Sequence, residues 1–277
     1  MPFLRLLRPH HWIKNFFVFI PIFFAKEIFS WDKLESTFLA FVVFCLLASS
    51  VYVINDIVDR EQDALHPKKK TRPIASGQVK VPAAIVLAFV LIIGAAVFIW
   101  QLIPAVIYAA VIYLGMNLAY SFALKHYAIF DVLLISALYL VRVMAGGIAS
   151  QTPVSSWLVL CTLFVTLFLI LGKRKAEMTH KKQRRVLGSY NPDVVDHLLT
   201  ISVSLTLISY SLYSVLGVES PYAVFSIFFV LLALFRYLHL TYSDDASTEN
   251  PEKILLKDQV VLGSIIGWVI FMFIIFY

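Results

Sequence analysis

Long apolar runs recur along the whole chain, and they constrain its fold more than any other feature. Of the 277 residues, 60% are hydrophobic and 14% are charged, and the mean hydropathy is +0.84. A soluble domain could not cover so much apolar surface, whereas runs near twenty residues match the thickness of a bilayer. We therefore predict an all-α, polytopic membrane protein with one transmembrane domain over residues 1–277. Its nine predicted spans are 12–30, 36–58, 82–100, 104–123, 130–149, 155–172, 194–216, 222–241 and 259–277.

Basic residues are distributed unevenly between the predicted loops. With the N-terminus in the cytoplasm, most of the 23 Lys and Arg residues fall in inner loops, and only Lys26 and Lys33 fall on the outer side. This bias follows the positive-inside rule, so the net charge of +6 requires no nucleic-acid partner. We expect the N-terminus and the functional site to face the cytoplasm, and the C-terminus to face the other side.

An acidic motif, N-D-x-x-D-x-x-x-D, ends the second predicted span. Asn55 precedes Asp56, Asp59 and Asp63, and the i, i+3, i+7 spacing places three carboxylates on one helix face. Such carboxylates repel one another at a membrane unless a divalent cation joins them. Oxygen ligands suit Mg²⁺, which leaves positions for phosphate oxygens. We predict that these four residues bind Mg²⁺; the simpler interpretation is a solvated helix end.

Two basic segments follow predicted spans. The acidic motif is followed by Lys68, Lys70 and Arg72, which could bind phosphates beside the metal. The sixth span is followed by a second charged segment, in which Lys173 and Glu177 have the i, i+4 spacing of a helical pair. Part of this charge sets topology or attracts anionic lipids. The remainder, with Arg174 and Arg184, would neutralise phosphate.

Three further polar residues are candidates for the site. Arg142 lies within the fifth span, where an arginine is costly, so we expect it to face a polar interior. Asp131, at the start of that span, has two open interpretations, a helix cap or a substrate ligand. Lys14 begins the first span and could reach a phosphate or a lipid head group.

With these residues, the chain resembles the UbiA-type superfamily of intramembrane prenyltransferases. Asn55, Asp56, Asp59 and Asp63 match the motif of that superfamily without a gap. The resemblance implies nine transmembrane helices around a central cavity and Mg²⁺-dependent binding of a diphosphate.

One branch, the decaprenyl-phosphate phosphoribosyltransferases, is similar over more of the chain. Quinone-type members carry a second acidic D-x-x-x-D motif, where this chain has Lys173, Arg174 and a single Glu177. The matching patterns are Arg8-Pro9-x-x-Trp12-x-Lys14-Asn15, His66-Pro67 with Lys70 and Arg72-Pro73-Ile74-Ala75-x-Gly77, Lys125 before Asp131-Val132, Arg142 with Gly146-Gly147, and Gly172-Lys173-Arg174-x-x-Glu177.

The resemblance implies a transferase of a bacterial inner membrane. It would move 5-phosphoribose from phosphoribosyl diphosphate to a polyprenyl phosphate, release pyrophosphate and supply arabinan to a cell envelope. Extra cations at the second cluster would reduce repulsion between two anionic substrates. The implied catalytic residues are Asp56, Asp59, Asp63, Lys173 and Glu177, and the implied substrate ligands are Lys14, Asn55, Lys68, Lys70, Arg72, Lys125, Asp131, Arg142, Arg174 and Arg184.

Two alternatives remain open at this point. The same fold and metal site could transfer a prenyl group to an aromatic or quinone precursor, although the basic second cluster argues against it. A transporter would need ionisable groups near the bilayer midplane, whereas the acidic residues here cluster at one edge. The sequence does not predict an oligomeric state.

Overall fold

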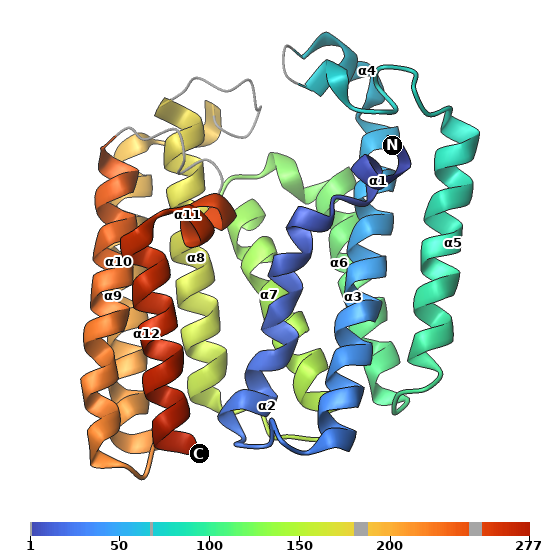
Figure 1. Cartoon of the computed structure of the whole chain (residues 1–277). Coiled ribbons are helices and arrows are strands. Elements are labelled where there is room, and N and C mark those ends of the chain that lie inside the picture. The colour runs from blue at the N-terminus through green and yellow to red at the C-terminus, as the bar shows by residue number, and fades with distance from the viewer. Residues whose placement is uncertain (1, 67–68, 180–187, 244–250) are drawn as a thin grey trace. The chain divides into compact units, whose positions relative to one another are not determined.

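The described part of the chain is built from helices joined by short turns (Figure 1). The computed structural model describes residues 2–66, 69–179, 188–243 and 251–277. Eta labels mark 3₁₀ helices, except η5, which is a π-helix. The helices are α1 (Pro2–Leu7), η1 (Pro9–Phe19), α2 (Ile20–Phe24), α3 (Trp31–Val58), α4 (Arg60–Leu65), η2 (Lys69–Thr71), α5 (Val81–Ile99), α6 (Ala105–Phe122), η3 (Leu124–His126), α7 (Phe130–Ala149), α8 (Ser156–Thr179), α9 (Pro192–Leu212), η5 (Tyr213–Gly217), η6 (Pro221–Ser226), α10 (Ile227–Tyr242), α11 (Pro251–Lys257) and α12 (Gln259–Phe276).

Eight helical segments in the described residues are long and apolar enough to cross a membrane. The prediction of an all-α, multi-pass membrane protein is therefore confirmed. The first predicted span, 12–30, is instead an 11-residue 3₁₀ helix, η1, followed by the five-residue α2. Proline lies in the first turn of each of these two helices, where its fixed φ is tolerated.

The chain divides into two compact units, which are described separately. Unit 1 comprises Met1–Phe122 and Val141–Pro153, and unit 2 comprises Ala123–Leu140 and Val154–Tyr277. A single transmembrane domain over 1–277 was predicted from the sequence, and that remains a proposal.

In unit 1, α3 is the element against which the others pack. It contacts α5, α6, α1 and η1, and Figure 1 shows α5 running beside it. The indole of Trp12 donates to Ser49 Oγ at 3.0 Å, and Ser49 donates to the carbonyl of Leu7 at 2.8 Å. These two bonds fix η1 and the end of α1 to α3. Near the acidic end of α3 a buried apolar cluster supports this packing, formed by Leu6, Val53, Ile74, Val79, Ala84, Ala88 and Leu91.

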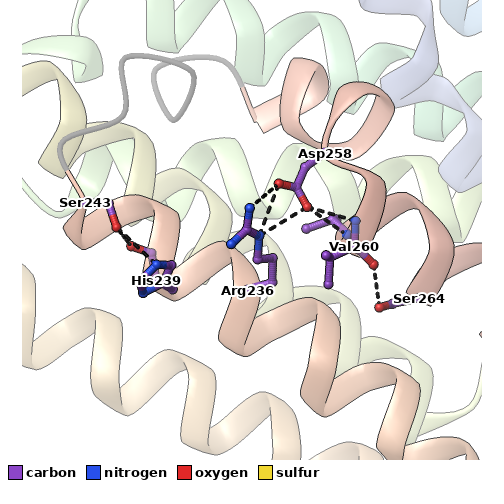
Figure 2. Close-up of polar contacts among 7 residues, drawn as sticks. Arg236, His239, Ser243, Asp258, Val260 and Ser264 are labelled. Carbon is purple, nitrogen blue, oxygen red and sulfur yellow. Dashed lines mark hydrogen bonds and ion pairs between the residues drawn. The ribbon is translucent and has the colours of Figure 1, made fainter.

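In unit 2, α8 packs on α9 and α10 packs on α12. Gly172 allows α8 and α10 to approach closely, because a Cβ atom there would lie 2.8 Å from the Tyr237 ring. This contact lies directly before the charged end of α8. At the start of α12, Asp258 accepts hydrogen bonds from the N–H groups of Val260 and Val261 and from the guanidinium of Arg236 on α10 (Figure 2). Arg236 falls in the predicted span 222–241, and it reaches this helix end.

Candidate functional site

The acidic motif lies where α3 passes into α4. Asp59 separates the two helices with φ −87° and ψ 3°, but its N–H still bonds the Asn55 carbonyl at 2.9 Å, and its carbonyl accepts from Asp63 N at 2.8 Å. The chain therefore continues in nearly helical form across the break. Asp56 and Asp63 are both buried, at 2% exposed, whereas Asn55 and Asp59 are half-buried.

A single cationic nitrogen joins the two buried aspartates. Arg72 Nη1 lies 2.9 Å from Asp56 Oδ1 and 2.6 Å from Asp63 Oδ2. Two carboxylate oxygens thus converge on one positively charged atom. Mg²⁺ is commonly held by one or two carboxylates, with phosphate and water oxygens completing its shell. The donor set of Asp56 and Asp63 therefore fits a divalent cation.

Two more cations surround these carboxylates. Arg8 Nη2 lies 2.6 Å from the same Asp56 Oδ1, with its guanidinium 5.0 Å from the centre of the Tyr52 ring. Lys69 Nζ lies 3.5 Å from Asp63 Oδ1. Three cations thus contact these two carboxylates. A site of this kind attracts anions such as phosphates.

The structure brings together part of the predicted metal site. In the described residues no group of three or more His, Cys, Asp or Glu side chains is placed to hold a metal ion. Asp56 and Asp63 converge, while the roles of Asn55 and Asp59 stay predictions. The side chain of Lys70 is exposed, and Lys68 lies outside the described residues.

Arg8 and Lys69 were not among the residues predicted for the site. Arg8 did carry a signal, since the Arg8-Pro9 pattern was part of the family resemblance. Its backbone adopts a left-handed conformation, with φ 49°, which no pattern of residue types indicated. Lys69 stands between two lysines that were predicted, and the sequence alone did not distinguish which of the three would reach Asp63.

Arg142 lies in a buried polar network in unit 1. It is 6% exposed, and it donates from Nε to Asn15 Oδ1 and from Nη2 to Tyr113 Oη, both at 2.8 Å. Its guanidinium also lies 4.7 Å from the centre of the Tyr113 ring. Asn15 in turn donates to the Cys45 thiol at 3.3 Å. The expected polar surroundings are present, while its role as a substrate ligand, like that of half-buried Lys14, stays a prediction.

The second charged cluster lies in unit 2 and is almost fully buried. Arg174 is 1% exposed, and it donates from Nε to Asp131 Oδ2 at 2.9 Å and from Nη1 to Glu177 Oε2 at 2.6 Å. Burying an arginine is costly without such partners. Arg174 was predicted to bind phosphate, and here its guanidinium joins two carboxylates. Lys173, the preceding residue, is half-buried.

Tyr190 completes this cluster. Its hydroxyl donates to Asp131 Oδ1 and accepts the N–H of Ile129 at 2.9 Å. Asp131 is fully buried in the first turn of α7. Neither of its two open interpretations, a helix cap or a substrate ligand, had included Tyr190 or Arg174 as a partner. No sequence pattern had indicated Tyr190. Lys125, in η3, is half-buried, and Arg184 lies outside the described residues.

The chain is similar to known proteins of one family. The profile of the UbiA prenyltransferase family matches residues 15–257. Decaprenyl-phosphate phosphoribosyltransferase of Mycobacterium tuberculosis (strain CDC 1551 / Oshkosh) is 34% identical over 96% of this chain and 91% of its own. The enzyme of the same name from Mycolicibacterium smegmatis is 35% identical over 96% of this chain and 89% of its own.

A solved structure shares the fold. It is a UbiA homolog from Archaeoglobus fulgidus bound to DMAPP and Mg²⁺, which superposes with a TM-score of 0.74 and 16% identity over 100% of this chain and 99% of that one. The profile match covers most of the sequence, and the relatives align along nearly all of it. The chain therefore belongs to the UbiA prenyltransferase family.

Proposed function

We propose that the protein transfers 5-phosphoribose from phosphoribosyl diphosphate to a polyprenyl phosphate and releases pyrophosphate. The observation that carries the proposal is the identity of 34–35% to enzymes named decaprenyl-phosphate phosphoribosyltransferase, which extends over 96% of the chain. The residue composition of the two clusters supports it. Arg8, Lys69 and Arg72 surround the acidic pair, and Arg174 lies where quinone-type members carry carboxylates.

The acidic cluster of unit 1 binds the diphosphate. Asp56 and Asp63, with Asn55 and Asp59 beside them, would hold Mg²⁺, and Arg8, Arg72 and Lys69 exchange carboxylate contacts for phosphate oxygens. When bound, the metal stabilises the negative charge of the departing pyrophosphate. The arginines can bind phosphate through two parallel hydrogen bonds, which fixes its orientation as well as its charge.

We assign phosphate binding in unit 2 to Lys173 and Lys125. Both are half-buried rather than enclosed, whereas Arg174 is held by Asp131 and Glu177. Arg174 then orients Glu177, to which we assign a ribose hydroxyl.

The reaction itself requires little proton movement. An oxygen of the lipid phosphate attacks C1 of ribose, a C–O bond forms, and the bond from C1 to pyrophosphate breaks with its electron pair on the leaving group. The attacking phosphate is already ionised near neutral pH, so no general base is needed. Catalysis rests on positioning and on neutralising the two anions.

The proposal also assigns a location. The predicted orientation places the acidic end of α3 at the cytoplasmic face of a bacterial inner membrane, where soluble phosphoribosyl diphosphate is available. The apolar exterior of the spanning helices offers the polyprenyl tail a bilayer environment, and the lipid product would serve arabinan synthesis.

The decisive experiment supplies purified protein in liposomes with labelled phosphoribosyl diphosphate, polyprenyl phosphate and Mg²⁺. A labelled lipid is expected, together with one pyrophosphate for each lipid formed. A parallel reaction contains a polyprenyl diphosphate and an aromatic acid. Prenylation of the aromatic acid without formation of the labelled phosphoribosyl lipid would reject the proposal in favour of an aromatic prenyltransferase.

A further inference from the structure

The hydroxyl of Tyr190 connects three parts of unit 2. Tyr190 directly precedes the N-cap of α9, and it is 7% exposed. Its hydroxyl donates to Asp131 Oδ1 in α7 and accepts from the backbone N–H of Ile129 at 2.9 Å. Burial raises the pKa of Tyr190, and the hydrogen bond to Asp131 raises it further. The hydroxyl therefore keeps its proton at neutral pH and remains a donor.

This bond divides the Asp131 carboxylate between two partners. Oδ1 accepts from Tyr190, and Oδ2 accepts from Arg174 Nε at 2.9 Å. Arg174 keeps its Nη1 for Glu177, at 2.6 Å. Without the tyrosine hydroxyl, the Asp131 carboxylate would lose one of the two bonds that fix its orientation. A carboxylate that can rotate would orient Arg174 less well toward Glu177.

The same hydroxyl also holds a strained turn. Ile129 has φ 69°, a left-handed conformation that is unfavourable for a β-branched residue. Such strain persists only where the surroundings impose it, and the bond from Ile129 N to Tyr190 is one such constraint. The turn joins α7 to η3, the short helix that carries Lys125.

We propose that Tyr190 is a positioning residue for phosphate binding by the second cluster. Through Asp131 it holds the orientation of Arg174 and Glu177. Through Ile129 it holds the turn that joins η3, which carries Lys125, to α7. This inference rests on the proposed function, because its effect is read from phosphoribosyl transfer.

Tyr190→Phe tests the inference, with Tyr237→Phe as the matched control. Both variants lose one hydroxyl from the same buried apolar cluster, but the Tyr237 hydroxyl donates to a helix carbonyl, that of Leu169, at 3.1 Å. In liposomes, Tyr190→Phe should raise the KM for an anionic substrate about tenfold to a hundredfold, with a smaller change in kcat. Tyr237→Phe should remain within about twofold of the wild type. Similar melting temperatures for the two variants would exclude a general loss of structure.

A double-mutant cycle separates positioning from mere stability. If Tyr190 acts through Asp131, the loss caused by Tyr190→Phe should largely disappear in an Asp131→Asn background. Fully additive losses would overturn the inference, as would equal activity of Tyr190→Phe and Tyr237→Phe.

Two further outcomes remain interpretable. If Tyr190→Phe alone does not fold, the double variant Ile129→Gly/Tyr190→Phe removes the strain at the turn, and the same rise in KM is required of it. If the wild type forms no phosphoribosyl lipid, the proposed function is wrong. If the wild type is active and Tyr190→Phe is equally active, only the role of Tyr190 is wrong.

Discussion

Gly146 of α7 lies directly against the backbone of Val18 in η1. A Cβ atom at position 146 would stand 1.9 Å from the Val18 carbonyl oxygen, and Val18 is itself fully buried. Neither the added atom nor the backbone it meets can move away by changing a rotamer. The pair therefore fixes how closely η1 and α7 approach each other in unit 1.

The first prediction follows from this contact. Gly146→Ala should reduce the free energy of unfolding by on the order of 3 kcal/mol, because the two backbones must separate. The measurement is thermal unfolding in detergent. Gly115→Ala in α6 is the control, since nothing lies within 4 Å of its Cβ position, and it should be neutral or gain up to about 1 kcal/mol from helix propensity. Equal melting temperatures for the two variants would contradict the prediction.

The second prediction concerns the acidic cluster. Asp63→Asn should lower turnover on the order of 100-fold and raise the Mg²⁺ concentration needed for half-maximal rate, because one of two converging carboxylates is lost. Glu61→Gln is the control: Glu61 lies on the same short helix, α4, but its side chain is 83% exposed and pairs with Arg60. Steady-state assays across a Mg²⁺ titration measure both variants. Unchanged Mg²⁺ dependence in Asp63→Asn would place the metal elsewhere.

The third prediction concerns the turn before α7. Ile129→Gly should raise the free energy of unfolding by about 1 kcal/mol, because glycine adopts positive φ without strain and Ile129 is already 46% exposed. Ile129→Ala loses the same apolar atoms beyond Cβ but keeps the strain, so it should bring no gain. The measurement is the melting temperature of the wild type, Ile129→Gly and Ile129→Ala. An equal gain in the alanine and glycine variants would show that the Ile129 side chain, and not the backbone conformation, lowers the stability.

The fourth prediction is a dependence of stability on pH. The hydrogen bond from Arg236 lowers the pKa of Asp258, and the N–H groups of Val260 and Val261 also contribute. A lowered folded pKa means that the stabilisation is complete above the unfolded value, about 3.9, and is lost as the pH falls through the folded value. The wild-type protein should therefore lose this contribution only below about pH 4.

Asp258→Asn provides the comparison for that prediction. Its melting temperature should lie below the wild-type value at pH 7 and pH 5, and the difference should narrow toward pH 3. A difference that is constant over this range would mean that the carboxylate charge does not stabilise the junction of α10 and α12 shown in Figure 2.

Much of this architecture could be predicted because it follows from local properties of the sequence. Apolar runs indicated the long helices, and the acidic motif was correctly placed at the end of α3, since hydropathy and i, i+3, i+7 spacing depend on near neighbours. Arg142 was expected in a polar interior because an exposed charge in lipid is costly. Its partners Asn15 and Tyr113 are remote in sequence. Asn15 belonged to a family pattern, but nothing linked it to Arg142, and Tyr113 had no signal.

The second cluster shows why the remaining contacts could not be predicted. Arg174 appeared suited to phosphate because it follows a basic pattern, but Asp131, 43 residues away, takes one side of its guanidinium. Tyr190 was missed because a lone tyrosine in a loop has no distinguishing pattern. Likewise, no rule of residue spacing indicates that Arg8 adopts φ 49° and thereby approaches Asp56.

The 3₁₀ geometry of η1 affects the number of membrane crossings that the chain can make. A 3₁₀ helix advances about 2.0 Å per residue and an α-helix about 1.5 Å, so η1 and α2 together extend roughly 30 Å, one hydrocarbon thickness. Neither is a long α-helix, yet together they are long enough to serve as a crossing. Added to the eight long segments of the described residues, they make the number of crossings odd, and that parity decides whether the two ends of the polypeptide share a compartment or are separated by the bilayer.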